Sequence, residues 1–274
     1  MSNLSNLQLR VISAIVLAIV VLALTWFGGL PFRLLSAVIA LAMFYEWCTM
    51  SRTVSNGGYQ WLSAVFLAIP VLALVGGMAA STVWLVLAGA IGVSAIVGLI
   101  RGQGTWTTFG LAYAGLSGIS LALLRGSETA GLIAILFLFA TVWATDIMAY
   151  FVGRAVGGPK LAPAISPGKT WSGAAGGTIG GLVAGVLVAA IAGGTNLAVM
   201  ALVALLLSIV SQAGDLFESW VKRRHGVKDS SHLIPGHGGV MDRVDGLVVA
   251  ALALYVIGML LGDAANPAAG LFVR

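Results

Sequence analysis

Long apolar runs, separated by short polar segments, follow one another along almost the whole chain. Each run approaches the ~20 residues that a helix needs to cross the hydrocarbon core of a bilayer. An open strand cannot satisfy its backbone in lipid, and the runs lack the alternation of a membrane barrel, so we expect helices. The runs are 11–28, 31–50, 60–79, 82–100, 107–124, 129–151, 173–193, 196–216 and 246–262. The pattern predicts an all-α polytopic transmembrane helix bundle with about nine spans.

The composition agrees with this pattern and leaves no room for a separate soluble domain. The 274 residues are 59% hydrophobic and 8% charged, with a mean hydropathy of +1.05, whereas a soluble domain has about 25% charged residues. We therefore expect one integral membrane domain over 1–274, with N-terminal helical spans in 1–128 and a C-terminal part in 129–274 that carries the longest polar loops. The first run, 11–28, is interpreted as a retained span, because no small-x-small cleavage site follows it.

The basic residues are distributed unevenly between the two sides of the predicted bundle. With nine spans and a cytoplasmic N-terminus, Arg33, Arg125 and Arg274 lie outside, which leaves 11 of the 14 basic residues inside. Cytoplasmic loops are enriched in Lys and Arg, so this distribution supports the orientation. The two longest polar loops, 152–172 and 217–245, then face the cytoplasm. The same rule accounts for the net charge of +5, and we expect no nucleic-acid partner.

Charged residues are so scarce that their concentration in 215–245 is informative. This segment holds five of the nine carboxylates, five of the 14 basic residues and all three histidines. Its acids lie where one span leaves the bilayer and the next enters. Ionisable residues at membrane depth cost free energy, so their presence there indicates a function. The five acids are Asp215, Glu218, Asp229, Asp242 and Asp245.

The spacing of these residues predicts a metal site formed by the ends of two helices. Asp215, Ser219 and Lys222 share one face of a helix that extends the eighth span into the cytoplasm. Asp242 and Asp245 lie near the N-terminus of the ninth span, where the helix dipole favours anions. Carboxylates suit a hard cation such as Mg²⁺, which takes one or two of them together with phosphate and water oxygens. The single cysteine, Cys48, excludes a cysteine-based cluster.

The loop between these acids is rich in glycine and in basic residues. Glycines such as Gly238 and Gly239 let backbone N–H groups approach an anion closely and form a phosphate-binding nest. His237 is the histidine that we expect to contact a substrate. The basic residues that flank the loop and predict a polyphosphate site are Lys222, Arg223, Lys228 and Arg243.

A second polar cluster closes the sixth span and fills the following loop. The run Ser166-Pro167-Gly168-Lys169-Thr170-Trp171 is not a P-loop, because Pro163 occupies the position of the required first glycine. Lys169 and Thr170 could nevertheless serve a phosphate. Asp146, inside an apolar span, either pairs with a base or contributes to the ion site. Glu46, also inside a span, has no partner that the sequence identifies.

Glycines recur at every fourth position of the seventh span. Gly173, Gly177, Gly181 and Gly185 place a smooth stripe on one helix face. Such stripes let two helix backbones approach closely in a membrane, so we expect close helix packing here in preference to ligand contact.

The polar residues of the C-terminal half together resemble the signature of the phosphatidate cytidylyltransferases, also called CDP-diacylglycerol synthases. The resemblance runs through the 27 consecutive positions 219–245, from Ser219-Trp220-Val221-Lys222-Arg223 through Lys228-Asp229 to Ile234-Pro235-Gly236-His237-Gly238-Gly239-Val240-Met241-Asp242-Arg243-Val244-Asp245. The run 166–171 is also similar to a family segment, although Ser172 stands where the family often has Glu or Gln. The N-terminal half matches only as a hydrophobic pattern.

The resemblance implies a reaction in which CTP and phosphatidate give CDP-diacylglycerol and pyrophosphate. It also implies Mg²⁺ on Asp215 and Asp242, with Asp245 as a further candidate and Asp146 as a ligand of a second divalent or monovalent ion. Lys222, Arg223, Lys228 and Arg243 would bind phosphates. Substrate contacts are expected from Ser219, Asp229, His237, Gly238, Gly239, Ser166, Lys169 and Thr170. The expected location is the bacterial cytoplasmic membrane, with the active site facing the cytoplasm; a homodimer is left open.

Two other functions are compatible with parts of the sequence. A CDP-alcohol phosphatidyltransferase motif begins D-x-x-D-G, which Asp242-Arg243-Val244-Asp245-Gly246 matches, but Val249-Ala250 stands where that motif requires Ala-Arg. A polytopic anion transporter would fit the spans and Asp146, but such transporters usually have repeats and a site at the midplane. The predicted site here lies at one face of the membrane.

Overall fold

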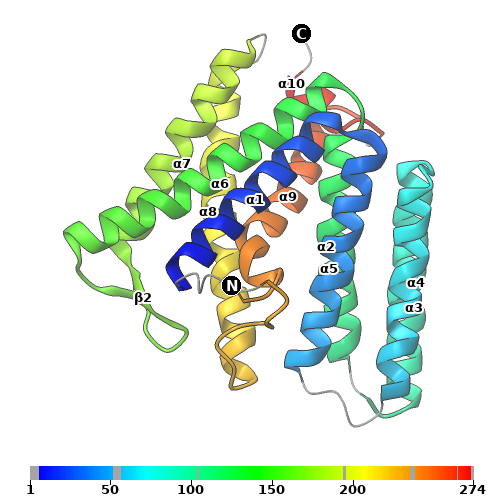
Figure 1. Cartoon of the computed structure of the whole chain (residues 1–274). Coiled ribbons are helices and arrows are strands. Elements are labelled where there is room, and N and C mark those ends of the chain that lie inside the picture. The colour runs from blue at the N-terminus through cyan, green and yellow to red at the C-terminus, as the bar shows by residue number, and fades with distance from the viewer. Residues whose placement is uncertain are drawn as a thin grey trace. The chain divides into compact units, whose positions relative to one another are not determined.

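The computed structural model describes residues 6–51, 57–103, 105–193, 196–234, 238–263 and 265–272. Most of these residues are helical, which confirms the all-α class. The elements are α1 (Asn6–Phe27), α2 (Gly29–Met50), α3 (Gly57–Val75), α4 (Ala80–Ile100), α5 (Trp106–Arg125), α6 (Thr129–Val156), β1 (Lys160–Ala162), β2 (Ser166–Thr170), α7 (Trp171–Ala192), α8 (Leu197–Arg224), α9 (Met241–Leu261) and α10 (Ala269–Phe272) (Figure 1).

Among the described residues, eight helices, α2 to α9, are long and apolar enough to cross a membrane. Large apolar side chains on these helices are exposed, as for Trp61 (78% exposed), Leu85 (74%) and Ile191 (85%). Such surfaces suit lipid and would be unfavourable in water. The chain is therefore an integral membrane protein. The apolar part of α1, Ile12–Phe27, is shorter than these spans, so the ninth span and the side of the N-terminus stay predictions.

The chain divides into two compact units. The first unit contains residues 1–122 and 225–244, and the second contains 123–224 and 245–274. The first unit thus combines the N-terminal helices with the glycine-rich loop that precedes α9. The second unit contains α6 to α8, the two strands and most of α9. The predicted division at residue 128 groups the chain differently and stays a prediction.

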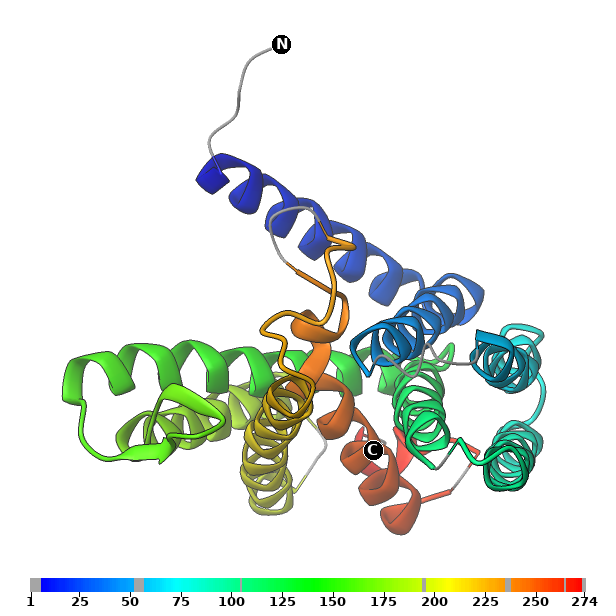
Figure 2. The same ribbon diagram turned by 90° about the horizontal axis from the view of Figure 1, so that it is seen from below.

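In the first unit, antiparallel helices pack in sequential order. α3 lies beside α4 (Figures 1 and 2), and the turn between them uses Gly77 at φ +75°. α2 is joined to the start of α5 through Trp47, which stacks on Trp106 with ring centroids 4.9 Å apart. The indole N–H of Trp47 also donates to the backbone oxygen of Trp106, at 3.1 Å. These contacts fix the end of α2, where Glu46 lies.

In the second unit, α6 packs along α7, and α8 packs against both of these helices. A hairpin of β1 and β2 connects α6 to α7 and lies beside the C-terminal end of α6 (Figure 1). Its strands are antiparallel, with Lys160 opposite Thr170 and Ala162 opposite Ser166. The hydrophobic pattern did not predict this hairpin, because its short strands lie in a polar segment. By contrast, the predicted extension of the eighth span is confirmed, since α8 continues to Arg224.

The glycine stripe of α7 is the surface on which this helix packs, as predicted. All four glycines of the stripe are buried, and a Cβ atom added to the first three would lie 2.7 to 2.9 Å from backbone oxygens of α6. Real Cβ atoms essentially never approach so closely, so the two backbones are in direct contact. The pairs are Gly173 with Ala149, Gly177 with Thr145 and Gly181 with Thr141.

Replacing Gly177 with alanine is expected to destabilise the second unit by about 1–3 kcal/mol, the usual cost of overpacking. The added methyl group would lie 2.7 Å from the backbone oxygen of Thr145, so α6 and α7 would have to separate. The measurement is thermal unfolding in detergent micelles. Gly89→Ala is the matched control, because among the described residues no heavy atom lies within 4 Å of a Cβ at Gly89. Equal unfolding temperatures for Gly177→Ala and the wild type would contradict the packing argument.

Candidate active site

The second unit contains a cavity of about 690 Å³ at the cytoplasmic end predicted for its helices. This volume lies within the ~300–1,000 Å³ of typical small-molecule sites. Its walls come from the C-terminal part of α6, from the hairpin, from the first turn of α7 and from the C-terminal half of α8. The polar and charged residues that line it are Asp146, Tyr150, Arg154, Lys160, Lys169, Thr170, Gln212 and Asp215. Both predicted polar clusters of the C-terminal half therefore contribute to one cavity.

An ion pair between Lys169 and Asp215 joins two walls of this cavity. Lys169 comes from β2, and Asp215 comes from α8. Their side chains are 28% and 30% exposed, so water and a ligand can reach both of them. The hydroxyl of Ser219, one helical turn beyond Asp215, donates to this carboxylate at 3.4 Å. This contact agrees with the predicted shared face of α8.

Two further aspartates of the second unit interact electrostatically with Asp215. Asp146 interacts electrostatically with Asp215 and with Lys169, and Asp245 interacts with both Asp215 and Asp146. The carboxylate of Asp245 also accepts a hydrogen bond from the backbone N–H of Gly246, at 2.7 Å. Three of the four predicted metal ligands thus influence one another within a single unit. The fourth, Asp242, lies in the first unit.

These carboxylates fit a hard cation by their chemistry, since oxygen atoms are the ligands that Mg²⁺ prefers. Among the described residues, no three His, Cys, Asp or Glu side chains are grouped closely enough to hold a metal ion. Mg²⁺ commonly completes its shell with water and substrate phosphate oxygens. The residues therefore fit an ion that is bound together with a phosphate-bearing substrate.

The predicted phosphate-binding residues of the hairpin have different surroundings. Thr170 is buried, and its hydroxyl accepts from the backbone N–H of Gly173 at 3.1 Å, which caps the N-terminus of α7. This is a common role for threonine at that position. Ser166 begins β2 and is half-buried, but it is not among the described residues that line the cavity. Lys169 is therefore the residue of this run that faces the cavity with a charge.

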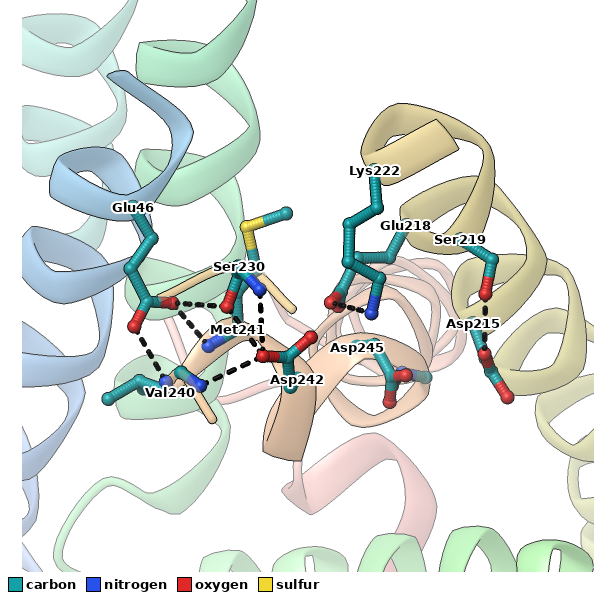
Figure 3. A network of polar contacts seen from close by, with 12 residues as sticks. Glu46, Asp215, Glu218, Ser219, Lys222, Ser230, Val240, Met241, Asp242 and Asp245 are labelled. Atoms are coloured by element: carbon teal, nitrogen blue, oxygen red, sulfur yellow. Dashed lines mark hydrogen bonds and ion pairs between the residues drawn. The ribbon is translucent and has the colours of Figure 1, made fainter. Parts of the chain in front are cut away.

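The basic residues at the end of α8 have protein partners. Lys222 pairs with the carboxylate of Glu218, at 2.9 Å (Figure 3), and Glu218 is fully buried. The guanidinium of Arg223 donates to the backbone oxygen of Ile165, at 3.3 Å, and so connects α8 to the hairpin turn. The pairing of Lys222 with Glu218 could have been predicted from their i, i+4 spacing.

In the first unit, Asp242 holds the glycine-rich loop against the start of α9. One of its oxygens accepts hydrogen bonds from the backbone N–H of Ser230 at 2.9 Å, from the Ser230 hydroxyl at 2.8 Å and from the backbone N–H of Gly239 at 2.8 Å (Figure 3). The sequence predicted that the backbone N–H of Gly239 binds a phosphate. In the structure this N–H donates to the carboxylate of Asp242. Asp242 as a metal ligand stays a prediction.

The remaining predicted residues of the loop are mostly exposed. Lys228, Asp229 and Arg243 are exposed, where they can meet a soluble ligand. Gly238 adopts φ +84°, a backbone conformation that favours glycine, and its backbone oxygen accepts from the N–H of Ile234 at 2.9 Å. His237 lies outside the described residues.

The residue that sequence reasoning missed is Glu46 of α2. It is fully buried, and its carboxylate accepts hydrogen bonds from the glycine-rich loop, with Ser230 as one donor (Figure 3). A carboxylate in an apolar span is costly unless it has partners, and this was the available signal. The partner itself was not predictable, because it lies 184 positions further along the chain.

Comparison with known proteins finds similar chains over nearly the whole length of this sequence. The sequence model of the cytidylyltransferase family matches residues 8–261. A phosphatidate cytidylyltransferase of Brucella suis biovar 1 is 49% identical over 276 residues, which cover 98% of this chain and 99% of the relative. That of Rickettsia typhi is 30% identical over 264 residues, with 93% of each chain covered. A shorter match, 44% identical over 125 residues, is found with the phosphatidate cytidylyltransferase of Haemophilus influenzae.

Proposed function

The chain belongs to the cytidylyltransferase family, and on this premise we propose that it converts CTP and phosphatidate to CDP-diacylglycerol and pyrophosphate. The relatives named phosphatidate cytidylyltransferase cover nearly the whole chain, which supports the same activity here. The observation that carries the proposal is the cavity in which Lys169 and Asp215 pair beside Asp146. It offers a cation for phosphate and carboxylates for a metal ion.

The proposed reaction is an in-line transfer of a cytidylyl group. A phosphate oxygen of phosphatidate attacks the α-phosphorus of CTP, a new P–O–P bond forms, and the bond to the β-phosphate breaks so that pyrophosphate leaves. Such a transfer depends on positioning and on charge neutralisation more than on a protein nucleophile. A bound Mg²⁺ would supply charge neutralisation to the phosphate oxygens.

The residues of the chain have complementary tasks in this proposal. Asp215, with Asp146 and Asp245 near it, would hold the metal ion by its carboxylate. Lys169 exchanges its partner Asp215 for a phosphate group when the substrate enters, because an anionic substrate brings more negative charge than one carboxylate. The other proposed phosphate contacts come from Lys222, Arg223, Lys228 and Arg243.

The proposed location of the cavity suits both substrates. Phosphatidate lies in the bilayer, whereas CTP is dissolved in the cytoplasm, so the site has to lie at their boundary. The uneven distribution of basic residues supports a cytoplasmic orientation, and the bacterial relatives support placement in the cytoplasmic membrane. Arg154 and Lys160 line the same cavity and add positive charge where an anionic headgroup would enter.

The test is a turnover assay with the purified protein in detergent micelles that contain phosphatidate. Radiolabelled CTP and Mg²⁺ should yield labelled CDP-diacylglycerol, together with an equal amount of pyrophosphate. A protein that only releases CMP from CDP-diacylglycerol would instead be a CDP-alcohol phosphatidyltransferase. Anion flux into proteoliposomes without consumption of CTP would indicate a transporter. Either of these two results would overturn the proposal.

Removal of divalent cations is expected to abolish turnover. The carboxylates around Asp215 repel a polyphosphate unless a cation lies between them, so excess EDTA should lower the rate below detection, and added Mg²⁺ should restore it. Thermal unfolding measured with and without EDTA provides the control for stability. Full turnover in EDTA, at an unchanged unfolding temperature, would exclude the proposed metal dependence.

A further inference from the structure

The buried carboxylate of Glu46 accepts four hydrogen bonds from residues far away in the sequence. Its Oε1 accepts from the hydroxyl of Ser231 at 2.6 Å and from the backbone N–H of Val240 at 2.8 Å. Its Oε2 accepts from the hydroxyl of Ser230 at 3.1 Å and from the backbone N–H of Met241 at 2.7 Å (Figure 3). Both oxygens therefore have two donors each, and the side chain is 0% exposed.

The four donors lie at the two ends of one loop. Ser230 and Ser231 begin the glycine-rich segment, and Val240 and Met241 end it where α9 starts. One carboxylate from α2 thus holds the two ends of this segment together. Space for this arrangement depends on Gly239, because a Cβ at that position would collide with the hydroxyl oxygen of Ser230 and lie 2.5 Å from Oε1 of Glu46.

The same contact satisfies the start of α9. The first N–H groups of a helix have no partner within the helix, and those of Val240 and Met241 point at Glu46. A negative charge at this end is also favoured by the helix dipole. Asp242 accepts from Ser230 and Gly239 in the same network. Two carboxylates from different helices therefore hold both ends of the loop and the start of α9 in place.

This first turn carries Asp242 and Arg243, and the loop is preceded by Lys228 and Asp229. All four were predicted as site residues, and none of them is held by Glu46 directly. We propose that Glu46 is a positioning residue for the cytidylyl transfer, which holds residues 230–231 and 240–241 together and thereby sets the orientation of Asp242 and Arg243. This inference rests on the proposed function.

The test compares three variants that differ in what they offer to the four donors. Glu46→Gln keeps the size of the side chain but replaces one accepting oxygen with an NH₂ group, which cannot accept a hydrogen bond. This NH₂ group then faces the backbone N–H of Val240 or Met241, which cannot rotate to find another acceptor. Glu46→Asp keeps two accepting oxygens and the charge. Glu128→Gln makes the same chemical change at an exposed residue and serves as the matched control.

The expected result is a fall in kcat/KM for CTP of about 10- to 100-fold in Glu46→Gln, the range seen when residues that orient a site are replaced. Glu46→Asp should recover a large part of this loss, and Glu128→Gln should equal the wild type. Hydrogen exchange should become faster in the peptide that covers 230–241 of Glu46→Gln, while the helices keep the wild-type rate.

Any of the following results would overturn the inference. The first is wild-type kcat/KM in Glu46→Gln. The second is a loss of activity accompanied by faster exchange throughout the helices, because this would mean that Glu46 only supports folding. The exchange measurement needs no turnover. An inactive wild type would therefore contradict the proposed function, whereas unchanged exchange in 230–241 would contradict the role of Glu46.

Discussion

Turnover of CTP is expected to fall by at least about 100-fold when Asp215 is replaced with asparagine, which is the usual effect of removing one group that stabilises charge at a reacting centre. Asparagine keeps the shape of the side chain but not its charge. It would bind a cation poorly, and it would leave the ammonium group of Lys169 without the carboxylate that it pairs with. The assay is labelled CTP with phosphatidate and Mg²⁺, and Asp215→Ala should behave in the same way.

A control is needed because Asp215 lies within α8 and its loss could affect folding. Asp263→Asn makes the same change at an exposed turn, and it should have wild-type turnover. Membrane insertion and the unfolding temperature of both variants should match those of the wild type. Near-normal turnover by correctly inserted Asp215→Asn protein would refute the metal role of this residue.

Replacement of Lys169 with methionine is expected to lower kcat/KM for CTP by about 10- to 100-fold, corresponding to the loss of a charge-assisted hydrogen bond to phosphate. Most of the effect should appear as a higher KM, because Lys169 neutralises charge that is already present in bound CTP. Lys169→Arg should retain much of the affinity, since it keeps the charge. Arg101→Met, at an exposed position outside the cavity, is the control for the loss of a basic residue.

The ion pair between Lys169 and Asp215 allows a sharper test than either single variant. If both residues act on the same bound nucleotide and metal ion, the double variant Asp215→Asn with Lys169→Met should lose less than the product of the two single losses, because contacting residues are coupled. Losses that multiply would mean that the two residues act independently. In that case the ion pair would have no part in binding CTP.

The spans could be predicted from the sequence because lipid imposes a local requirement. Every residue of a span must be compatible with hydrocarbon, and every backbone group must be satisfied within the helix, so a run of apolar residues is sufficient evidence. The glycine stripe of α7 was predictable for a similar reason. Its four-residue spacing places the glycines on one face of the helix, and this holds for any partner helix. The sequence did not identify α6 as the partner.

The hairpin between α6 and α7 was not predicted. Its strands are three and five residues long and lie in a polar segment, so they have no hydrophobic alternation to reveal them. Pairing of Lys160 with Thr170 depends on the ends of α6 and α7 being brought together. Only that pairing turns Lys169 toward Asp215, 46 positions away in sequence.

By itself, the sequence determined the membrane class, the long helices and the identity of most charged residues near the candidate site, because charge at membrane depth is costly and therefore conspicuous. The partners of those charges were decided only by the tertiary structure. Lys169 forms an ion pair with Asp215, and Glu46 binds the loop that begins at Ser230. The partners in both contacts lie so far apart in sequence that no local pattern predicts them. A hydrogen bond forms only when its donor and acceptor atoms lie about 3 Å apart. For residues far apart in sequence, helix packing decides whether the two atoms come this close.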